Sequence, residues 1–194
     1  ISSALTMPKS TTHHLLNVMQ DHFFVHYSRE QRAWSLGIAV LEVASAYLRS
    51  SPLAREGHRF LQQLTERTGA TSHIALVQGT DAVYVDKREP QGNGVRLVTE
   101  IGSRLPAHLT AVGRAVLSDF DDEQLAATYQ GYDWPLRTTS GPRNLDELRE
   151  ELARVRSTGV SLESGDTTPG IGCIACPIRS VTGRTTGAIG ISFM

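Results

Sequence analysis

The sequence lacks long apolar runs, has little cysteine and carries no excess of positive charge. These are the features typical of membrane proteins, of proteins in oxidising compartments and of proteins that bind nucleic acid over their whole surface. None of its apolar runs approaches the roughly 18 residues needed to cross a bilayer, and no stretch resembles a signal peptide. Only two of the 194 residues are cysteine, which predicts a reduced, cytoplasmic protein with no membrane partner. The net charge of -1 argues against a chain that is basic throughout.

Residues that would support catalysis or metal binding are also scarce. Residues 165–172 are rich in Gly and Thr but lack the Gly-Lys-Ser/Thr ending of a phosphate-binding loop. His108 has no nearby nucleophile with an orienting carboxylate. Cys173 and Cys176 lie three residues apart on a predicted strand, so they point to opposite faces and cannot form a disulfide. Zinc would need a second ligand pair. We therefore predict no catalytic residue, metal or cofactor, and we place Cys176 in the core.

Near its start the sequence contains a helix with two distinct faces, over residues 7–19. The side predicted to face inward carries the apolar residues Leu15, Val18 and Met19. The outward side is an unbroken polar stripe at spacing i, i+3, i+4 and i+7, formed by Ser10, His13, His14 and Asn17. A helix built only for solubility would normally carry Glu and Lys there. Short hydrogen-bonding side chains next to Lys9 instead favour a helix that lies against phosphates and base edges.

A predicted two-stranded ribbon follows this helix at once. Residues 23–27 and 32–36 are typical of strands, and residues 28–31 of the turn between them. A helix followed by such a ribbon is the winged form of the helix-turn-helix, with Arg29 and Arg32 on the wing. The sequence therefore predicts a partial DNA-binding domain over residues 1–37.

The charge and the next segment both suggest a dimer. Residues 1–37 carry three Lys or Arg against two Asp or Glu, a balance of only +1, so each subunit would bind phosphates modestly. Residues 38–51 are predicted to form a linker helix whose apolar positions cover more than one narrow face. A linker that also dimerises is the simplest account of that pattern.

Residues 52–194 mix helices and strands without a regular β-α-β alternation. Helices are expected over 53–67, 111–118, 121–128 and 144–159, and strands over 72–78, 82–87, 95–101, 160–164, 173–179 and 186–193. The segment 103–110 is expected to be a loop. This order predicts an α+β domain with a largely antiparallel sheet flanked by helices.

Three separated motifs then resemble one family, the IclR-type bacterial transcription regulators. They are residues 7–13, residues 102–115, and residues 172–178 followed by 187–192. The resemblance implies a winged helix-turn-helix, a linker helix and a GAF/profilin-like effector domain, working as a homodimer or dimer of dimers. The family's first winged-domain helix and its terminal helix are not matched. The implied contacts to double-stranded operator DNA are Lys9, Ser10, Thr11, Thr12, His13, His14, Asn17, Arg29 and Arg32.

The same resemblance implies a pocket for a small organic acid. Its residues would be His108, Thr110, Ala111, Val112, Glu163, Cys173, Gly190 and Ser192. The backbone N–H groups of Ala111 and Val112, at a helix start, would bind the carboxylate. Gly190 replaces a serine of some members and would leave room for a larger ligand body, and His14 replaces a common arginine.

Two functions stay open at this point. The first is a ligand-responsive transcription regulator. The alternative is a GAF-like small-molecule-binding or redox enzyme, with residues 1–37 as a protein-interaction module. The polar stripe on the first helix favours the regulator, because an enzyme has no use for it.

Overall fold

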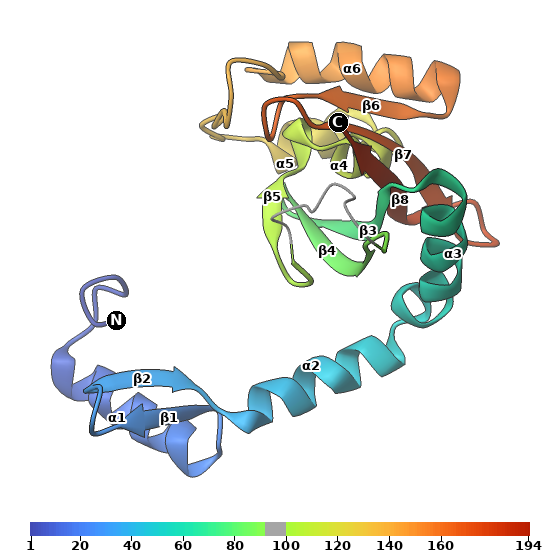
Figure 1. Ribbon diagram of the computed structural model, residues 1–194. Helices are drawn as coiled ribbons and strands as arrows, with labels where there is room; N and C mark the ends of the chain where they lie inside the picture. Colours follow the sequence, from blue (N-terminus) through green and yellow to red (C-terminus); the bar gives the residue numbers. More distant parts are fainter. Residues whose placement is uncertain (92–99) are drawn as a thin grey trace. The chain divides into compact units, whose positions relative to one another are not determined.

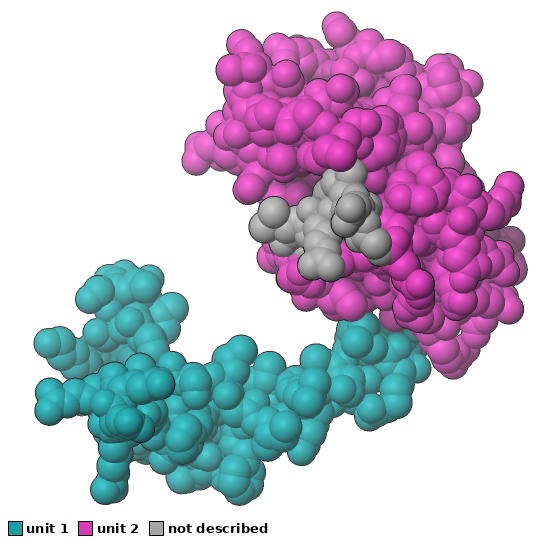
Figure 2. All heavy atoms as spheres, in the orientation of Figure 1, with its two compact units in different colours: residues 1–51 teal, residues 52–194 magenta. Residues whose placement is uncertain are grey.

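The computed structural model describes residues 1–91 and 100–194, which form two compact units, Ile1–Ser51 and Pro52–Met194 (Figure 2). The strand expected over 95–101 falls mostly outside the described residues. Within the described ranges, no helix combines the length and the apolar character that crossing a membrane requires.

The first unit consists of two helices around a two-stranded hairpin (Figure 1). Helix α1 (Lys9–Asp21) is followed by β1 (Val25–Ser28), β2 (Ala33–Leu36) and α2 (Ile38–Ser50). The two strands pair antiparallel, from Val25 opposite Leu36 to Ser28 opposite Ala33. The predicted order of helix, ribbon and second helix is therefore present.

The prediction of which face of α1 is covered was wrong. Thr12 is 7% exposed and its hydroxyl donates to the Pro8 carbonyl, whereas Leu15 is 46% exposed and Val18 and Met19 are also exposed. Periodicity separates the two faces of a helix but does not say which face a neighbour covers. Here His13 lies beside the hairpin, with its ring edge-on to Trp34 at 6.5 Å between centroids.

The second unit is built on a six-stranded sheet of order β5-β4-β3-β8-β7-β6, and every pairing among its described strands is antiparallel. The strands are β3 (Thr71–Gln78), β4 (Asp81–Arg88), β5 (Arg104–Pro106), β6 (Ser161–Ser164), β7 (Gly172–Arg179) and β8 (Thr185–Phe193). The expected α+β class is confirmed. Strand β5 lies in the segment that was expected to be a loop.

Helices cover the two faces of this sheet. Helix α3 (Pro52–Thr68) packs on one face, where Leu61, Ile74 and Val85 form a small core. The 3-10 turn η1 (Ala107–Leu109) and helices α4 (Ala111–Leu117), α5 (Asp122–Thr128) and α6 (Leu145–Thr158) belong to the main core on the other face. Helix α6 begins and ends as predicted, because the Asn144 side chain accepts from the Glu147 N–H and Gly159 adopts φ +74°.

Candidate functional site

A row of polar side chains, three of them buried and one half-buried, crosses the sheet near its β6 edge. Thr71, Ser192, Cys173 and Glu163 occupy neighbouring positions on β3, β8, β7 and β6. Thr71 and Ser192 are fully buried, and the Cys173 Sγ lies 3.0 Å from the Ser192 Oγ. Burial of polar groups costs free energy unless they are hydrogen-bonded, so a row of them in one place indicates a functional site.

Glu163 holds the loop that follows β6. Its Oε1 accepts the N–H of Asp166 at 2.5 Å and that of Thr167 at 3.2 Å. Its Oε2 has no hydrogen-bond partner among the described residues, and burial raises the pKa of the carboxyl. One oxygen of Glu163 thus holds the loop, and the described lining of the cavity does not include this residue.

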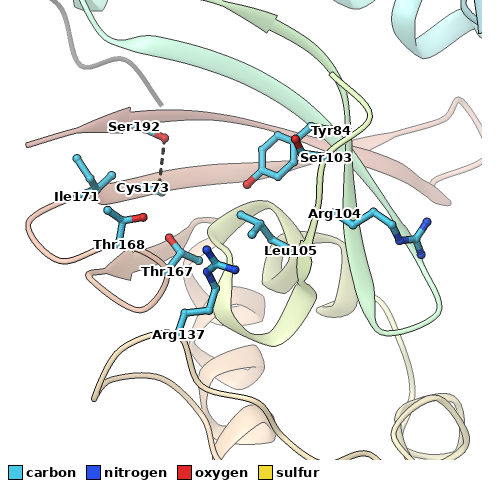
Figure 3. A pocket seen from close by; sticks show the side chains of 10 residues that line it. All are labelled: Tyr84, Ser103, Arg104, Leu105, Arg137, Thr167, Thr168, Ile171, Cys173 and Ser192. Atoms are coloured by element: carbon cyan, nitrogen blue, oxygen red, sulfur yellow. Dashed lines mark hydrogen bonds between the residues drawn. The ribbon is translucent and has the colours of Figure 1, made fainter. Parts of the chain in front are cut away.

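A cavity of about 260 Å³ lies beside this polar row. Figure 3 shows its lining: Tyr84, Ser103, Arg104, Leu105, Arg137, Thr167, Thr168, Ile171, Cys173 and Ser192. Its volume is near the lower end of the roughly 300–1,000 Å³ typical of small-molecule sites. The combination of apolar walls with hydroxyl, thiol and guanidinium groups suits a small polar ligand rather than a lipid.

The two arginines of the lining differ in their partners. The Arg104 guanidinium donates to Asp81 Oδ2 at 3.0 Å and to Gln78 Oε1 at 2.9 Å. Arg137, in the exposed connection between α5 and α6, makes no hydrogen bond or ion pair with any described residue. None of the described lining residues is acidic. The sequence interpretation missed Arg137, because it belongs to no motif.

Arg114 of α4 joins the segments that surround the cavity. It is 3% exposed; its Nε donates to the His108 carbonyl at 2.7 Å, its Nη1 donates to the Leu162 carbonyl at 3.2 Å, and its Nη2 pairs with Asp166. Breaking such a buried pair leaves an uncompensated charge, so the loop carrying Asp166 is firmly held.

Four of the predicted pocket residues serve structural roles beside the cavity. His108 is buried in an aromatic cluster with Tyr129, Tyr132 and Trp134, and burial, followed by the charge of Arg114, lowers its pKa to about 4. Thr110 caps α4 by accepting the Gly113 N–H at 3.0 Å. Ala111 and Val112 are buried, and the described lining of the cavity includes neither of them.

The expectation that Gly190 leaves room for a ligand needs correction. A Cβ built at Gly190 would lie 2.7 Å from the Ile174 carbonyl oxygen and 3.2 Å from His73 Nε2. The His73 ring fills that space and contacts the Tyr84 ring, with 5.3 Å between centroids. Gly190 is therefore required by close packing of the sheet, and a serine there would clash with backbone.

The two cysteines lie on opposite faces of β7, as predicted, and both are free. Cys176 is exposed, so its placement in the core was wrong. Alternation along β7 turns it away from the main core, against which Cys173 packs. Burial raises the pKa of the Cys173 thiol to about 12, which keeps it protonated and unreactive at neutral pH. Cys173 is thus suited to line the pocket rather than to attack a substrate.

The predicted DNA-contacting residues lie on α1 and at the hairpin turn. Lys9, Ser10, Thr11, His13, His14 and Asn17 are exposed on α1, and Arg29 and Arg32 are exposed at the turn. The Asn17 amide lies 3.1 Å from His13 Nδ1. Thr12 must be removed from the set, because its burial and its bond to Pro8 keep it from reaching a base edge.

Comparisons with known proteins agree with this architecture. Residues 45–194 match the family of the bacterial transcriptional regulator IclR C-terminal domain. The chain is 31% identical over 192 residues to the transcriptional repressor AllR of Salmonella typhi, covering 99% of this chain and 70% of that protein. The IclR transcriptional regulator of Alicyclobacillus acidocaldarius has the same fold, with a TM-score of 0.87 at 22% identity over 100% of this chain and 77% of that one.

A third relative has a named ligand. The inducer-binding domain of a double mutant of the PobR transcription factor from Acinetobacter, solved with 3-hydroxybenzoic acid, has a TM-score of 0.66 at 25% identity, over 73% of this chain and 83% of that one. The fold thus defines a protein whose larger unit is the C-terminal domain of a transcription regulator. The chain belongs to the IclR family of bacterial transcription regulators. Its relatives are regulators and repressors rather than enzymes, which confirms the regulator over the enzyme.

Proposed function

We propose that unit 1 binds an operator in double-stranded DNA and that a small organic acid in the unit 2 cavity changes this binding. The cavity beside the Ser192–Cys173 pair is the observation that carries the proposal, because it lies in the part of the chain that matches the family's C-terminal domain. The site of action would be the cytoplasm, where operator DNA is found.

The surface of α1 supports the DNA-binding half of the proposal. Lys9 and Arg32 would bind phosphates, while Ser10 and His13 would approach base edges in the major groove. The hairpin would act as the wing of a winged helix-turn-helix. The contact between His13 and Trp34 supports this arrangement, because it orients the imidazole from the wing side.

The apolar surface of α2 supports a homodimer. Leu41, Val43 and Tyr47 are exposed on this helix, and a second copy of the chain would cover them. Two half-sites on DNA require two copies of the binding module. Sedimentation of the intact protein at micromolar concentration should show a dimer or a dimer of dimers, and a monomer would contradict this part of the proposal.

The polarity and size of the cavity support an organic acid as the effector. Its described lining contains hydroxyl groups and two arginines, of which Arg104 is paired with Asp81, and no carboxylate. An anion is favoured in such surroundings. The acid bound by the PobR domain is a member of this class. A hydroxy acid or an aromatic hydroxy acid would use both the cation and the hydroxyl-lined end.

A titration of operator binding tests the proposal. DNA from beside the protein's own gene would be used in a mobility-shift assay at fixed salt, because phosphate contacts make affinity salt-dependent. A panel of lactate, benzoate and 3-hydroxybenzoate would then be added. A change in operator affinity with at least one acid is expected. Binding of DNA that no acid alters, together with no thermal stabilisation by any acid, would overturn it.

A further inference from the structure

The lining of the cavity contains one cation that no described residue neutralises. The guanidinium of Arg104 is held by Asp81 and Gln78, outside the cavity, whereas Arg137 has no such partner among the described residues. In Figure 3, Arg137 lies beside Thr167, and the Cys173–Ser192 pair lies at the other end of the lining. The cavity therefore has a cationic end and a hydroxyl–thiol end.

Contacts on both sides fix the backbone that carries Arg137. Three residues before it, Trp134 stacks on Tyr129 at 4.8 Å between centroids and 19° between planes. One residue after it, the Thr138 hydroxyl donates to the Gly165 carbonyl at 2.7 Å. An arginine in a long exposed connection would normally be mobile, but these two contacts hold the backbone of Arg137 at the cavity.

The opposite wall of the cationic end is also fixed. The Thr167 N–H is held by Glu163, and the adjacent Asp166 by Arg114. In Figure 3, Thr167 of this restrained loop lies next to Arg137, and Thr168 lies beyond it, beside Ile171. A guanidinium with hydroxyl donors beside it is suited to a carboxylate, because charge-assisted hydrogen bonds are stronger than neutral ones.

We propose that Arg137 is the residue that binds the carboxylate of the effector, with the ligand body against Tyr84, Leu105 and Ile171 and a ligand hydroxyl at the Cys173–Ser192 end. This inference rests on the proposed function and deepens it. It moves the carboxylate from the N–H groups of Ala111 and Val112, which the described lining of the cavity does not include, to a side chain in the α5–α6 connection.

The test is calorimetric titration of the full chain with 3-hydroxybenzoate, benzoate and lactate, and with neutral 3-hydroxybenzamide. Arg137→Gln removes the charge, and Arg137→Lys keeps it without the bidentate geometry. Arg184→Gln is the matched control, since Arg184 is an exposed arginine of the same unit that is not part of the described lining of this cavity. Because Arg137 is exposed and unpaired among the described residues, its variants should retain the thermal midpoint of the unliganded protein.

We expect Arg137→Gln to weaken binding of the tightest acid by about ten- to a hundredfold, the effect of one charged hydrogen bond. Binding of the amide should stay unchanged, Arg137→Lys should give an intermediate loss, and Arg184→Gln should bind as the wild type does. If Arg137→Gln binds the acid with wild-type affinity, the inference is wrong while the proposed function stands. If the wild-type protein binds none of the acids, both fail.

Discussion

The two units of the chain use their apolar residues in opposite ways. In unit 2 the side chains of Leu117, Leu125, Leu148 and Leu152 are completely buried around α4. In unit 1 the buried apolar residues are Val25 and Ala39, and most of the larger apolar side chains of α1 and α2 are exposed. Unit 2 therefore has a large hydrophobic core of its own, whereas unit 1 has a small core and exposes most of its apolar side chains.

The ends of their helices differ in the same way. Helices α4, α5 and α6 begin at Thr110, Asp121 and Asn144, each of which accepts a backbone N–H of the first turn. Helices α1 and α2 begin at Pro8 and Gly37 without a side-chain cap. Unit 2 is thus stabilised from within, whereas unit 1 has fewer internal contacts, as expected if it has the DNA-binding and dimerising roles proposed above.

The largest expected difference between the units is in the effect of a truncated leucine. Leu152→Ala in α6 should lower the free energy of unfolding of unit 2 by about 2–5 kcal/mol, because it leaves a cavity in a close-packed core. Leu15→Ala in α1 should cost unit 1 less than about 0.5 kcal/mol, as for an exposed site. Urea unfolding measures both.

The two tryptophans make the measurement selective, since Trp34 lies in unit 1 and Trp134 in unit 2. Trp34→Phe leaves a reporter of unit 2, and Trp134→Phe a reporter of unit 1. A loss for Leu15→Ala as large as that for Leu152→Ala would show that another surface covers α1 in solution, and the contrast between the units would fail.

The elements that could be predicted from the sequence are those whose signals are local. Helix α6 carries its cap, Asn144, its apolar period, Leu148, Leu152 and Val155, and its terminating Gly159 within one segment, and its bounds were correct. Local pattern and spacing suffice for such a helix. The pocket residues Cys173 and Ser192, in contrast, were implied by the resemblance to the IclR-type family.

The features that were missed depend on contacts between distant segments. Strand β5 has three residues and exists because it pairs with Asp81–Val83 of β4. The buried face of α1 depends on where the hairpin lies, which the periodicity of α1 does not contain. Arg137 reaches the cavity because Thr138 bonds to Gly165, 27 residues further along the chain. No motif around Arg137 could have indicated that contact.

Acid should affect unit 2 through its buried histidines. Burial lowers the pKa values of His73 and His108 to about 4, from the ordinary 6.5, so the unfolded chain binds protons first as the pH falls. Stability is therefore full above about pH 6.5 and is lost between about pH 6.5 and 4, by about 3 kcal/mol for each histidine. His108→Phe, which retains the aromatic packing, should remove the part of this pH-dependent loss of stability that comes from His108.

Urea midpoints at pH 7, 5.5 and 4.5, followed at Trp134, measure this loss. The same series followed at Trp34 is the internal control, because the histidines of unit 1 are all exposed. An unchanged pH slope in His108→Phe would mean that His108 is not held neutral by its surroundings.

The smallest effects are expected for substitutions on the surface of unit 1. We expect some of them to weaken binding to every DNA sequence and others to weaken binding to the operator alone. A duplex selected for tight binding from a random pool would be compared with an unselected duplex of equal length, over a range of salt. Lys9→Ala should weaken both and reduce the salt slope by about 1, since a phosphate contact carries no sequence information. His13→Ala should cost about 1–3 kcal/mol on the selected duplex alone, as loss of a base contact does.

Thr12→Ser sharpens this division, because it retains the hydroxyl that bonds to Pro8. Thr12 lies beside His13 in the chain but is buried, so this variant should bind both duplexes as the wild type does. Equal losses on both duplexes for His13→Ala would assign His13 to the backbone rather than to a base. A loss for Thr12→Ser on the selected duplex would show that the face of α1 carrying Thr12 contacts DNA. The assignment of Thr12 to the covered face and of His13 to the DNA-contacting face would then be wrong.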